Sequence, residues 1–282
     1  MRKLLAPILI LIGVVCLMYP TIAIFAGNLR GLEVARAQSQ YQAELAARPD
    51  QGQRLIDDAR AYNSTLSGIP ILDPYLHRMS QQGSRDYEAY LSTLPSDNKV
   101  MGRLVVPSAS IDLPIRHGTD DDAIAHGVGH LFGTGLPVGG VGVNSVLTAH
   151  SGLTTASLFD GLRDVKAGDR ALVQVGGETL AYEVFAVNVI EPTDLKLFEP
   201  DPNRDILTLF TCTPYGVNTH RLVVSASRVE LSEADVTRYD PSWVSALRAW
   251  MVLPVTAIVA VAITVRKASR KPKRGIPHTG GA

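Results

Sequence analysis

The stretch "DILTLFTCTPYGVNTHRLVVSAS", residues 205–227, predicts two strands joined by a turn. A β-branched and apolar run ends at Pro214 and Gly216, which interrupt a strand, and a second run begins at Arg221. Strands joined by so short a loop are usually neighbours in a sheet. Pairing would allow Arg221 to face Cys212, so this hairpin predicts both a sheet and a candidate site.

The chain around this hairpin has the pattern of a β protein. From residue 99 onward, short runs rich in β-branched residues alternate with Pro and Gly. This pattern predicts a closed or sandwiched all-β domain rather than βαβ units, with one helical piece expected at 154–162. The expected strands lie within residues 99–118, 143–150, 170–177, 179–192, 205–211 and 221–231.

The region before the β domain has a helical composition. Residues 28–62 are rich in Ala, Leu, Glu, Gln and Arg, with Pro49 as a breaker or a first-turn residue. Residues 63–74 contain the Asn, Ser, Gly and Pro of a loop, and residues 84–94 predict a second short helix.

Both ends of the chain carry long apolar runs. Leu4 to Gly27 has no charged residue across 24 positions and is long enough to span a bilayer. Ala249 to Val265 has 17 residues, or about 25 Å of helix, slightly short of a hydrocarbon core of ~30 Å. Snorkelling of Arg248 would lengthen this second span to include residues 244–247. The alternatives are a cleaved signal peptide for the first run and a buried core helix for the second.

Basic residues flank both apolar runs, since Arg2 and Lys3 precede the first and six Lys or Arg follow the second. The positive-inside rule then places both termini in the cytoplasm and residues 28–243 on the outer face of a cell membrane. The expected organisation is an anchor at 1–27, a helical segment at 28–98, a β domain at 99–243, a second span at 244–265 and a basic cytoplasmic tail at 266–282.

The charge of the outer region limits its partners. Residues 28–243 hold 18 basic and 27 acidic residues, a net charge of about −9. This acidic balance argues against nucleic acid as a partner. The basic tail is better explained as a membrane-proximal anchor.

The chain has two cysteines, and Cys16 lies inside the first apolar run. Cys212 is therefore alone in the outer region, which excludes an intramolecular disulfide or a cysteine-based zinc site there. A lone extracellular thiol is open to oxidation, so its presence favours chemistry over packing. The alternative is a small buried hydrophobic residue.

A thiol that attacks an amide needs a thiolate, a donor for the developing oxyanion and an acid for the leaving amine. Arg221 could supply the donor and lower the pKa of Cys212, although it could also be a solvent-facing strand residue. His150 is the first candidate for the acid, because it ends a strand before a Gly-containing loop, as Cys212 does. His130 and His220 are alternatives, but strand alternation turns His220 away if Arg221 faces the site.

The segment "TLFTCTPYGVNTHRLVV", residues 208–224, is similar to the active-site segment of class C, or pilus-assembling, sortases, whose pattern is close to TLxTCTPYGxNxHRL. Four further segments fit the family, and the resemblance covers about residues 30–245. These segments are "GVGHLFGTGLPVGG" (127–140), "LTAHSGL" (147–153), "LFDGLRDVKAGD" (158–169) and "GETLAYEV" (177–184).

The resemblance implies a closed sortase-type β-barrel with short helices, a helical segment before it and a transmembrane helix on each side. It implies that Cys212 is the nucleophile, His150 the general acid and base, and Arg221 the stabiliser of the oxyanion and substrate. Thr211 is implied as a supporting residue and His130 as a structural one. Family members often have Gly-His-Arg-Gly where this chain has Ala-His-Ser-Gly at 149–152, which leaves contacts to the substrate open.

The resemblance also implies a lid loop at about residues 66–80, since pilus sortases carry an Asp-Pro-aromatic motif over the active site. Here the motif is Asp73, Pro74 and Tyr75. The carboxylate could pair with Arg221 while the ring covers Cys212. We expect this pair to be exposed and weak, roughly 0–1 kcal/mol, so that the lid opens readily. The alternative is an ordinary Asp-Pro turn.

The implied reaction is transpeptidation, in which a Leu-Pro-x-Thr-Gly-like sorting signal is cleaved between Thr and Gly. The acyl group then passes to a lysine of a pilin subunit, without any cofactor or metal. One alternative is anchoring of surface proteins to cell-wall peptidoglycan, and another is a non-enzymatic, membrane-tethered β domain that binds a partner. The acidic run "HGTDDD", 117–122, is expected to be a solvated turn rather than a calcium site.

Overall fold

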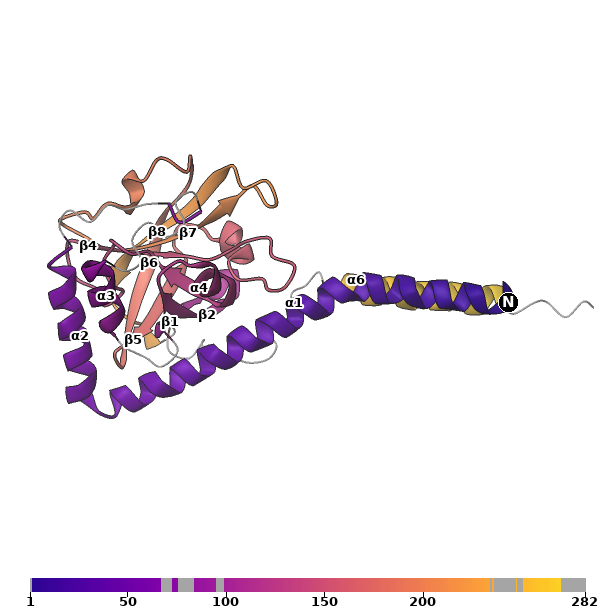
Figure 1. The fold of residues 1–282 in the computed structure, drawn as a ribbon, viewed down its shortest axis with the longest axis horizontal. Coiled ribbons are helices and arrows are strands. Elements are labelled where there is room, and N and C mark those ends of the chain that lie inside the picture. Colours follow the sequence, from indigo (N-terminus) through magenta and orange to yellow (C-terminus); the bar gives the residue numbers. More distant parts are fainter. Residues whose placement is uncertain are drawn as a thin grey trace, which may run out of the picture. The chain divides into compact units, whose positions relative to one another are not determined.

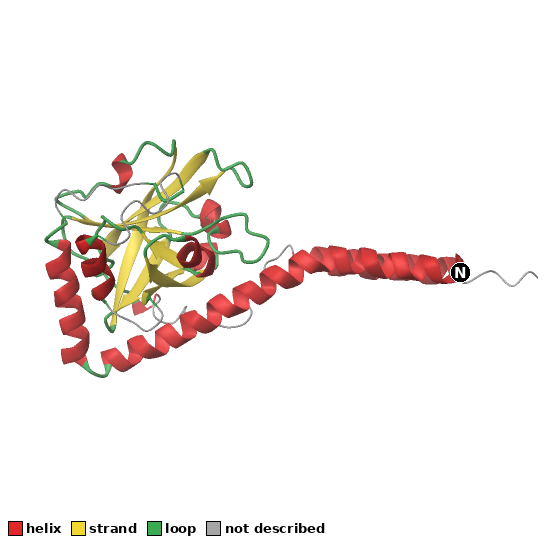
Figure 2. Ribbon diagram, in the orientation of Figure 1, coloured by secondary structure: helices red, strands yellow, loops and turns green. Residues whose placement is uncertain are grey.

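A computed structural model gives the architecture of the chain (Figures 1 and 2). It forms two compact units, Ala23–Ala246 on one hand and Met1–Ile22 with Leu247–Ala282 on the other. The structure describes residues 2–66, 73–75, 84–94, 99–233, 235, 247 and 251–269. Most of the expected lid loop and the tail beyond residue 269 lie outside these residues.

The helices of the described chain are α1 (Arg2–Ala46), α2 (Pro49–Asn63), α3 (Arg85–Ser92), α4 (Asp121–His126) and α6 (Val252–Ser269), with short 3₁₀ turns η1 (Pro107–Ala109), η2 (Asp160–Asp164) and η3 (Lys196–Phe198). The strands are β1 (Val100–Val106), β2 (Ile111–His117), β3 (Val128–His130), β4 (Val143–Thr148), β5 (Arg170–Val175), β6 (Glu178–Ile190), β7 (Asp205–Thr213) and β8 (His220–Val229).

The eight strands close into one barrel in the order β1-β2-β3-β4-β7-β8-β6-β5 (Figure 1). The pairs β2–β3 and β4–β7 are parallel, and the other pairs are antiparallel. Alternate side chains of each strand fill the interior, for example Leu104, Leu147, Leu207 and Val224. The β class that the strand pattern predicted is therefore confirmed, and so is the closed barrel that the family resemblance implied.

The two predicted helical stretches before the barrel are present. The first divides at Pro49, which occupies the first turn of α2, where a missing N–H costs nothing. The second is α3, whose N-terminus is capped by Ser84 accepting a hydrogen bond from the Tyr87 N–H. Both helices pack on the barrel, because Ile56 of α2 and Tyr90 of α3 belong to its hydrophobic core.

Two elements differ from the sequence prediction. A helix was expected at 154–162, but only η2 forms there, because the N–H groups of Ser157 and Phe159 bind Asn28 and the His150 carbonyl instead of a preceding turn. The acidic run "HGTDDD" is not a simple turn, since Asp120 caps α4 by accepting from the Ala123 N–H at 2.8 Å.

Helix α1 continues without a break through the end of the first apolar run at Gly27. Among the described residues, α1 alone is long and apolar enough to cross a membrane; its stretch Ile12–Ala46 contains an 18-residue window with a mean hydropathy of 1.8. Large apolar side chains of its first half, such as Ile10 and Leu17, are exposed. Helix α6 includes most of the second apolar run. It is not among the helices long and apolar enough to cross a membrane in the described chain, so the expected second span is not confirmed.

Candidate active site

The candidate site lies on the outer face of three neighbouring strands, β4, β7 and β8. On β7, Leu207 and Leu209 point into the barrel core, whereas Phe210 joins an outer apolar cluster. Cys212 is two residues beyond Phe210 and therefore shares its face. This outer cluster consists of Leu131, Val146, Phe198, Phe210 and Val223.

The strand registers bring His150, Cys212 and Arg221 to one end of this face. On one side of β7, Cys212 pairs directly with Arg221 of β8. On the other side, parallel β4 ends its ladder at the pair Thr148–Phe210. His150 lies two residues past Thr148, as Cys212 lies two residues past Phe210, so the two side chains are at the same level of adjacent chains.

Two hydroxyl groups extend this parallel pairing beyond the last backbone pair. The Oγ1 of Thr211 donates to the Ala149 carbonyl at 2.8 Å, and the Oγ of Ser151 donates to the Cys212 carbonyl at 2.9 Å. His150 lies between these two cross-links. They fix its backbone to that of Cys212 after the ladder has ended.

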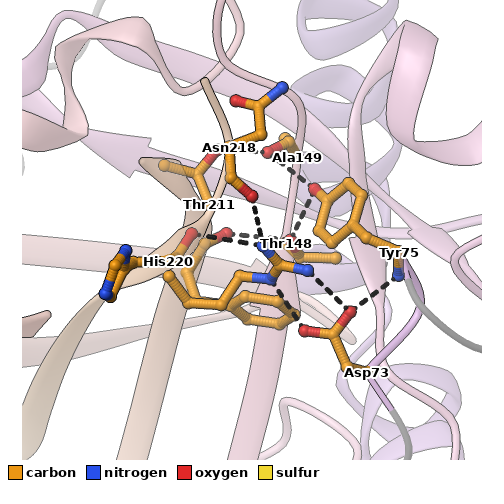
Figure 3. A network of polar contacts seen from close by, with 9 residues as sticks. Asp73, Tyr75, Thr148, Ala149, Thr211, Asn218 and His220 are labelled. Carbon is orange, nitrogen blue, oxygen red and sulfur yellow. Dashed lines mark hydrogen bonds and ion pairs between the residues drawn. The ribbon is translucent and has the colours of Figure 1, made fainter. Parts of the chain in front are cut away.

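The Asp73 carboxylate binds the guanidinium of Arg221, and Figure 3 shows Asp73 in this network of polar contacts. The Arg221 Nε donates to Asp73 Oδ2 at 2.7 Å, and the Nη2 donates to Asp73 Oδ1 at 3.1 Å. The Nη1 donates to the carbonyls of Asn218 and His220, at 3.2 Å each. The expected pair between Asp73 and Arg221 is therefore present, and it is a bidentate pair.

The expectation that this pair is exposed and weak is wrong. The side chains of Arg221 and Asp73 are only 3% and 1% exposed. A buried pair is costly to break by removing one partner, about 3–5 kcal/mol, because the other charge is left without compensation. Opening of the segment that carries Asp73 costs much less free energy than removal of one partner, because water then hydrates both charged groups.

Tyr75 packs over the end of β4 (Figure 3). Its hydroxyl donates to the Ala149 carbonyl at 3.1 Å and lies 3.0 Å from Thr148 Oγ1. Its ring centroid is 5.6 Å from that of His150, in an edge-on arrangement, and 5.1 Å from the guanidinium carbon of Arg221. Tyr75 thus contacts both residues that flank Cys212.

The surroundings of Cys212 favour a protonated thiol in this arrangement. Cys212 is 9% exposed. Burial raises the pKa of the thiol, the charge of Arg221 partly offsets this effect, and the charge of Asp73 raises the pKa further. A departure of Asp73 would therefore lower the pKa of Cys212.

The alternative histidines lie elsewhere. His130 is fully buried, with Nε2 2.8 Å from the Gly135 carbonyl and Nδ1 3.0 Å from the Tyr90 hydroxyl, and burial lowers its pKa to about 4. His220 is exposed, bonds to the neighbouring Thr219, and points away from the cluster in Figure 3. Of these three candidates, His150 is therefore the one that the fold brings level with Cys212.

Ser151 is a site residue that the sequence analysis missed. Its position was treated only as the loss of a family arginine, yet its hydroxyl holds the Cys212 carbonyl. The available signal was a hydroxyl residue directly after the strand-ending histidine. In the described part of the chain, no group of three or more His, Cys, Asp or Glu could hold a metal ion.

Comparison with known proteins places this geometry in a family. Residues 104–229 match the family model described as the sortase domain. Among curated relatives, the match spans 55% and 60% of the length of two sortases A, at 28% identity.

The match to similar solved structures spans nearly the whole length of those chains. Sortase A from Corynebacterium diphtheriae is 46% identical with a TM-score of 0.65, over 75% of this chain and 99% of that one. Sortase C-1 from Actinomyces oris is 47% identical with a TM-score of 0.60, over 64% and 99%. Streptococcus pneumoniae sortase C, whose structure was analysed for pilin substrate specificity, is 31% identical with a TM-score of 0.61, over 71% and 97%. The chain belongs to the sortase family of cysteine transpeptidases.

Proposed function

We propose that this chain is a membrane-anchored cysteine transpeptidase that polymerises pilin subunits. The observation that carries the proposal is the placement of His150, Cys212 and Arg221 at one end of β4, β7 and β8. A thiol, an imidazole and a guanidinium on adjacent strands supply the nucleophile, the acid and the oxyanion donor that amide cleavage needs.

In the proposed reaction, the Cys212 thiol gives its proton to His150, and the thiolate sulfur attacks the carbonyl carbon of Thr in a Leu-Pro-x-Thr-Gly-like signal. Arg221 donates hydrogen bonds to the oxyanion, and His150 protonates the departing Gly amine as the C–N bond breaks. A pilin lysine amine then attacks the thioester, gives its proton to His150, and forms an isopeptide bond while the Cys212 thiolate leaves. Similarity to a sortase C analysed for pilin substrate specificity supports pilin subunits as the substrates.

Asp73, Pro74 and Tyr75 act in this proposal as a lid that holds the enzyme in a resting state. The bidentate pair keeps Arg221 from a substrate, and the ring of Tyr75 lies against His150. Opening frees the guanidinium, uncovers the outer apolar cluster and lowers the pKa of Cys212. The sorting signal would take the place of the lid.

The membrane arrangement belongs to the same proposal. The exposed apolar half of α1 supports an N-terminal anchor. Helix α6 and the Lys and Arg residues that follow it support a second span with both termini in the cytoplasm. The barrel would then act on substrates outside the cell.

Anchoring of surface proteins to peptidoglycan is the second candidate, because it would use the same nucleophile, acid and oxyanion donor. The acceptor amine separates the two. The full chain, acylated with a sorting peptide, is offered either a pilin-derived lysine peptide or a peptidoglycan stem peptide. Transfer to the lysine peptide alone supports pilin polymerisation, and transfer to the stem peptide alone supports anchoring.

A further inference from the structure

A turn of α1 contacts the loop that follows His150. The Asn28 Nδ2 donates to the Ser157 Oγ at 3.1 Å, and the Ser157 N–H donates to the Asn28 Oδ1 at 2.8 Å. One side-chain amide thus binds one residue twice, across 129 positions of sequence. Ser157 is 1% exposed and Asn28 is half-buried, so this contact is partly shielded from solvent.

The neighbouring Gly27 lets the two backbones touch. A Cβ atom at Gly27 would lie 1.8 Å from the Thr155 carbonyl oxygen and 3.2 Å from the Ala156 Cβ. Separations below about 3 Å do not occur for a real Cβ, so any other residue would push the helix and the loop apart. One turn further along the same helix, a Cβ at Gly31 would meet only the Leu113 Cδ2, at an ordinary 3.5 Å.

The contacted loop is tied to His150 at its base. The Phe159 N–H donates to the His150 carbonyl at 3.0 Å, and the Gly152 N–H donates to Asp160 Oδ1 at 2.7 Å. Ser157 lies only two residues before Phe159. A shift of the loop where it contacts Asn28 therefore acts directly on the backbone of His150.

We propose that Gly27 and Asn28 are positioning residues that dock α1 on this loop and hold His150 where it can protonate the leaving amine. The inference rests on the acid role of His150 in the proposed function. It makes the helix that carries the expected membrane anchor a support of the loop that follows His150, so turnover depends on the two residues at the end of the apolar run.

The test compares Gly27→Ala with Gly31→Ala in the full chain in detergent. Both changes add one methyl group and gain the same helix propensity, roughly 1 kcal/mol, but only the first meets the loop backbone. We expect Gly27→Ala to lower kcat for an amide sorting peptide about 10-fold with little change in KM, because a small misplacement of a catalytic group is costly. Gly31→Ala should stay within about twofold of wild type.

A second substrate separates positioning from general damage. A thioester analogue of the sorting peptide has a leaving group that needs no proton. Misplaced His150 should slow the amide about 10-fold and the thioester far less, roughly twofold or under. Asn28→Leu should show the same pattern, and Asn28→Asp should restore amide turnover, because its carboxylate still accepts from the Ser157 N–H and hydroxyl.

Each outcome decides a separate point. Equal amide turnover in the two glycine variants overturns the inference, provided that the wild type is active. Equal losses on amide and thioester also overturn it, because they indicate structural damage rather than a misplaced acid. A wild type that turns over neither substrate overturns the proposed function itself.

Discussion

At the scale of single residues, Arg221 has two competing roles. It lies opposite Cys212 in the β7–β8 ladder. Its guanidinium donates hydrogen bonds to Asp73 and to two backbone carbonyls. The same donors that would stabilise an oxyanion are thus occupied in this arrangement. Catalysis requires that the carboxylate leave before the substrate carbonyl arrives.

Replacing Arg221 with Lys keeps the charge but loses the planar fork of donors. We expect the rate of Cys212 acylation to fall about 10²–10³-fold, the usual loss for an oxyanion donor. Intact-protein mass spectrometry over time measures this rate. Arg60→Lys, at an exposed helix pair with Asp57, is the control and should leave it unchanged. Acylation of the Arg221 variant at the wild-type rate would remove the proposed role.

Ser151 gives a smaller and more specific effect. Ser151→Ala removes the hydrogen bond to the Cys212 carbonyl, worth about 0.5–1.5 kcal/mol, so kcat should fall roughly 2–10-fold. Ser151→Thr keeps a hydroxyl and should recover most of that loss. Ser92→Ala, which removes a comparable bond on α3, is a matched control. Failure of Thr to recover activity would argue against the hydrogen bond as the cause.

These residues also show what the sequence allowed. The facing of Cys212 and Arg221 was predictable, because a short hairpin sets its own register. The place of His150 at the end of a strand, before a Gly-containing loop, favoured it over His130, and the family resemblance supported that choice. Its position level with Cys212 depends on the parallel pairing of β4 with β7, which no local pattern specifies. The bond from Ser151 to Cys212 depends on the same long-range register, so the hydroxyl residue after His150 did not by itself identify its partner.

At the scale of elements, the segment Asp73–Tyr75 is held to the barrel by polar contacts on both sides. Asp73 binds Arg221 of β8 and also accepts the Tyr75 N–H at 2.9 Å. The Tyr75 hydroxyl reaches the end of β4. One short segment therefore bridges the strands that carry Arg221 and the chain leading to His150.

Breaking this segment should activate the thiol. Asp73→Ala with Tyr75→Ala removes a charge that raises the pKa of Cys212 and frees Arg221, which lowers it. Alkylation of Cys212 by iodoacetamide should then be faster at pH 7, and its pH profile should move to lower pH. The matched control is Asp57→Ala, in an exposed pair. An unchanged profile would mean that the lid does not control the thiol.

Element prediction succeeded where patterns were long. The strands at 205–211 and 221–231 and the helix break at Pro49 all formed as expected. β3 was missed because it has three residues, too few for an alternation to show. The helix expected at 154–162 failed because Asn28 competes for the backbone of that segment.

At the scale of the whole molecule, buried histidines join α3 to the barrel. The Tyr90 hydroxyl accepts from the Gly118 N–H at 2.7 Å and lies 3.0 Å from Nδ1 of His130. His117 places Nε2 2.8 Å from the Thr93 carbonyl just beyond α3. Burial lowers the pKa of both histidines, so these contacts between α3 and the barrel favour neutral imidazole rings.

The buried His130 at this contact predicts that the folded chain loses stability in acid. The pKa of His130 is about 4 in the folded chain and about 6.5 when unfolded, so its contribution is complete above pH 6.5 and lost as pH falls toward 4. Between pH 7 and 5 the loss is about 2 kcal/mol. Thermal melts should show this drop, reduced in His130→Gln but not in His126→Gln, an exposed control. Equal pH dependence in all three would contradict the assignment.

The β class of the molecule was predictable from strand spacing, but closure into a barrel rather than a sandwich was not. Closure rests on the pairing of β1 with β5, from Arg103–Gln174 to Val105–Leu172, which no local signal specifies. The apolar run at Leu4 to Gly27 predicted an anchor, whereas its continuation as one helix into the barrel contact at Asn28 did not follow from composition.

The most direct test of the account is the mass of the full chain after incubation with a Leu-Pro-x-Thr-Gly peptide. The wild type, Cys212→Ala and the double lid variant Asp73→Ala with Tyr75→Ala are compared. We predict an acyl adduct that maps to Cys212, increases in the lid variant and is missing from Cys212→Ala. An adduct that persists in Cys212→Ala, or no adduct in any form with this peptide and its close variants, would contradict the account.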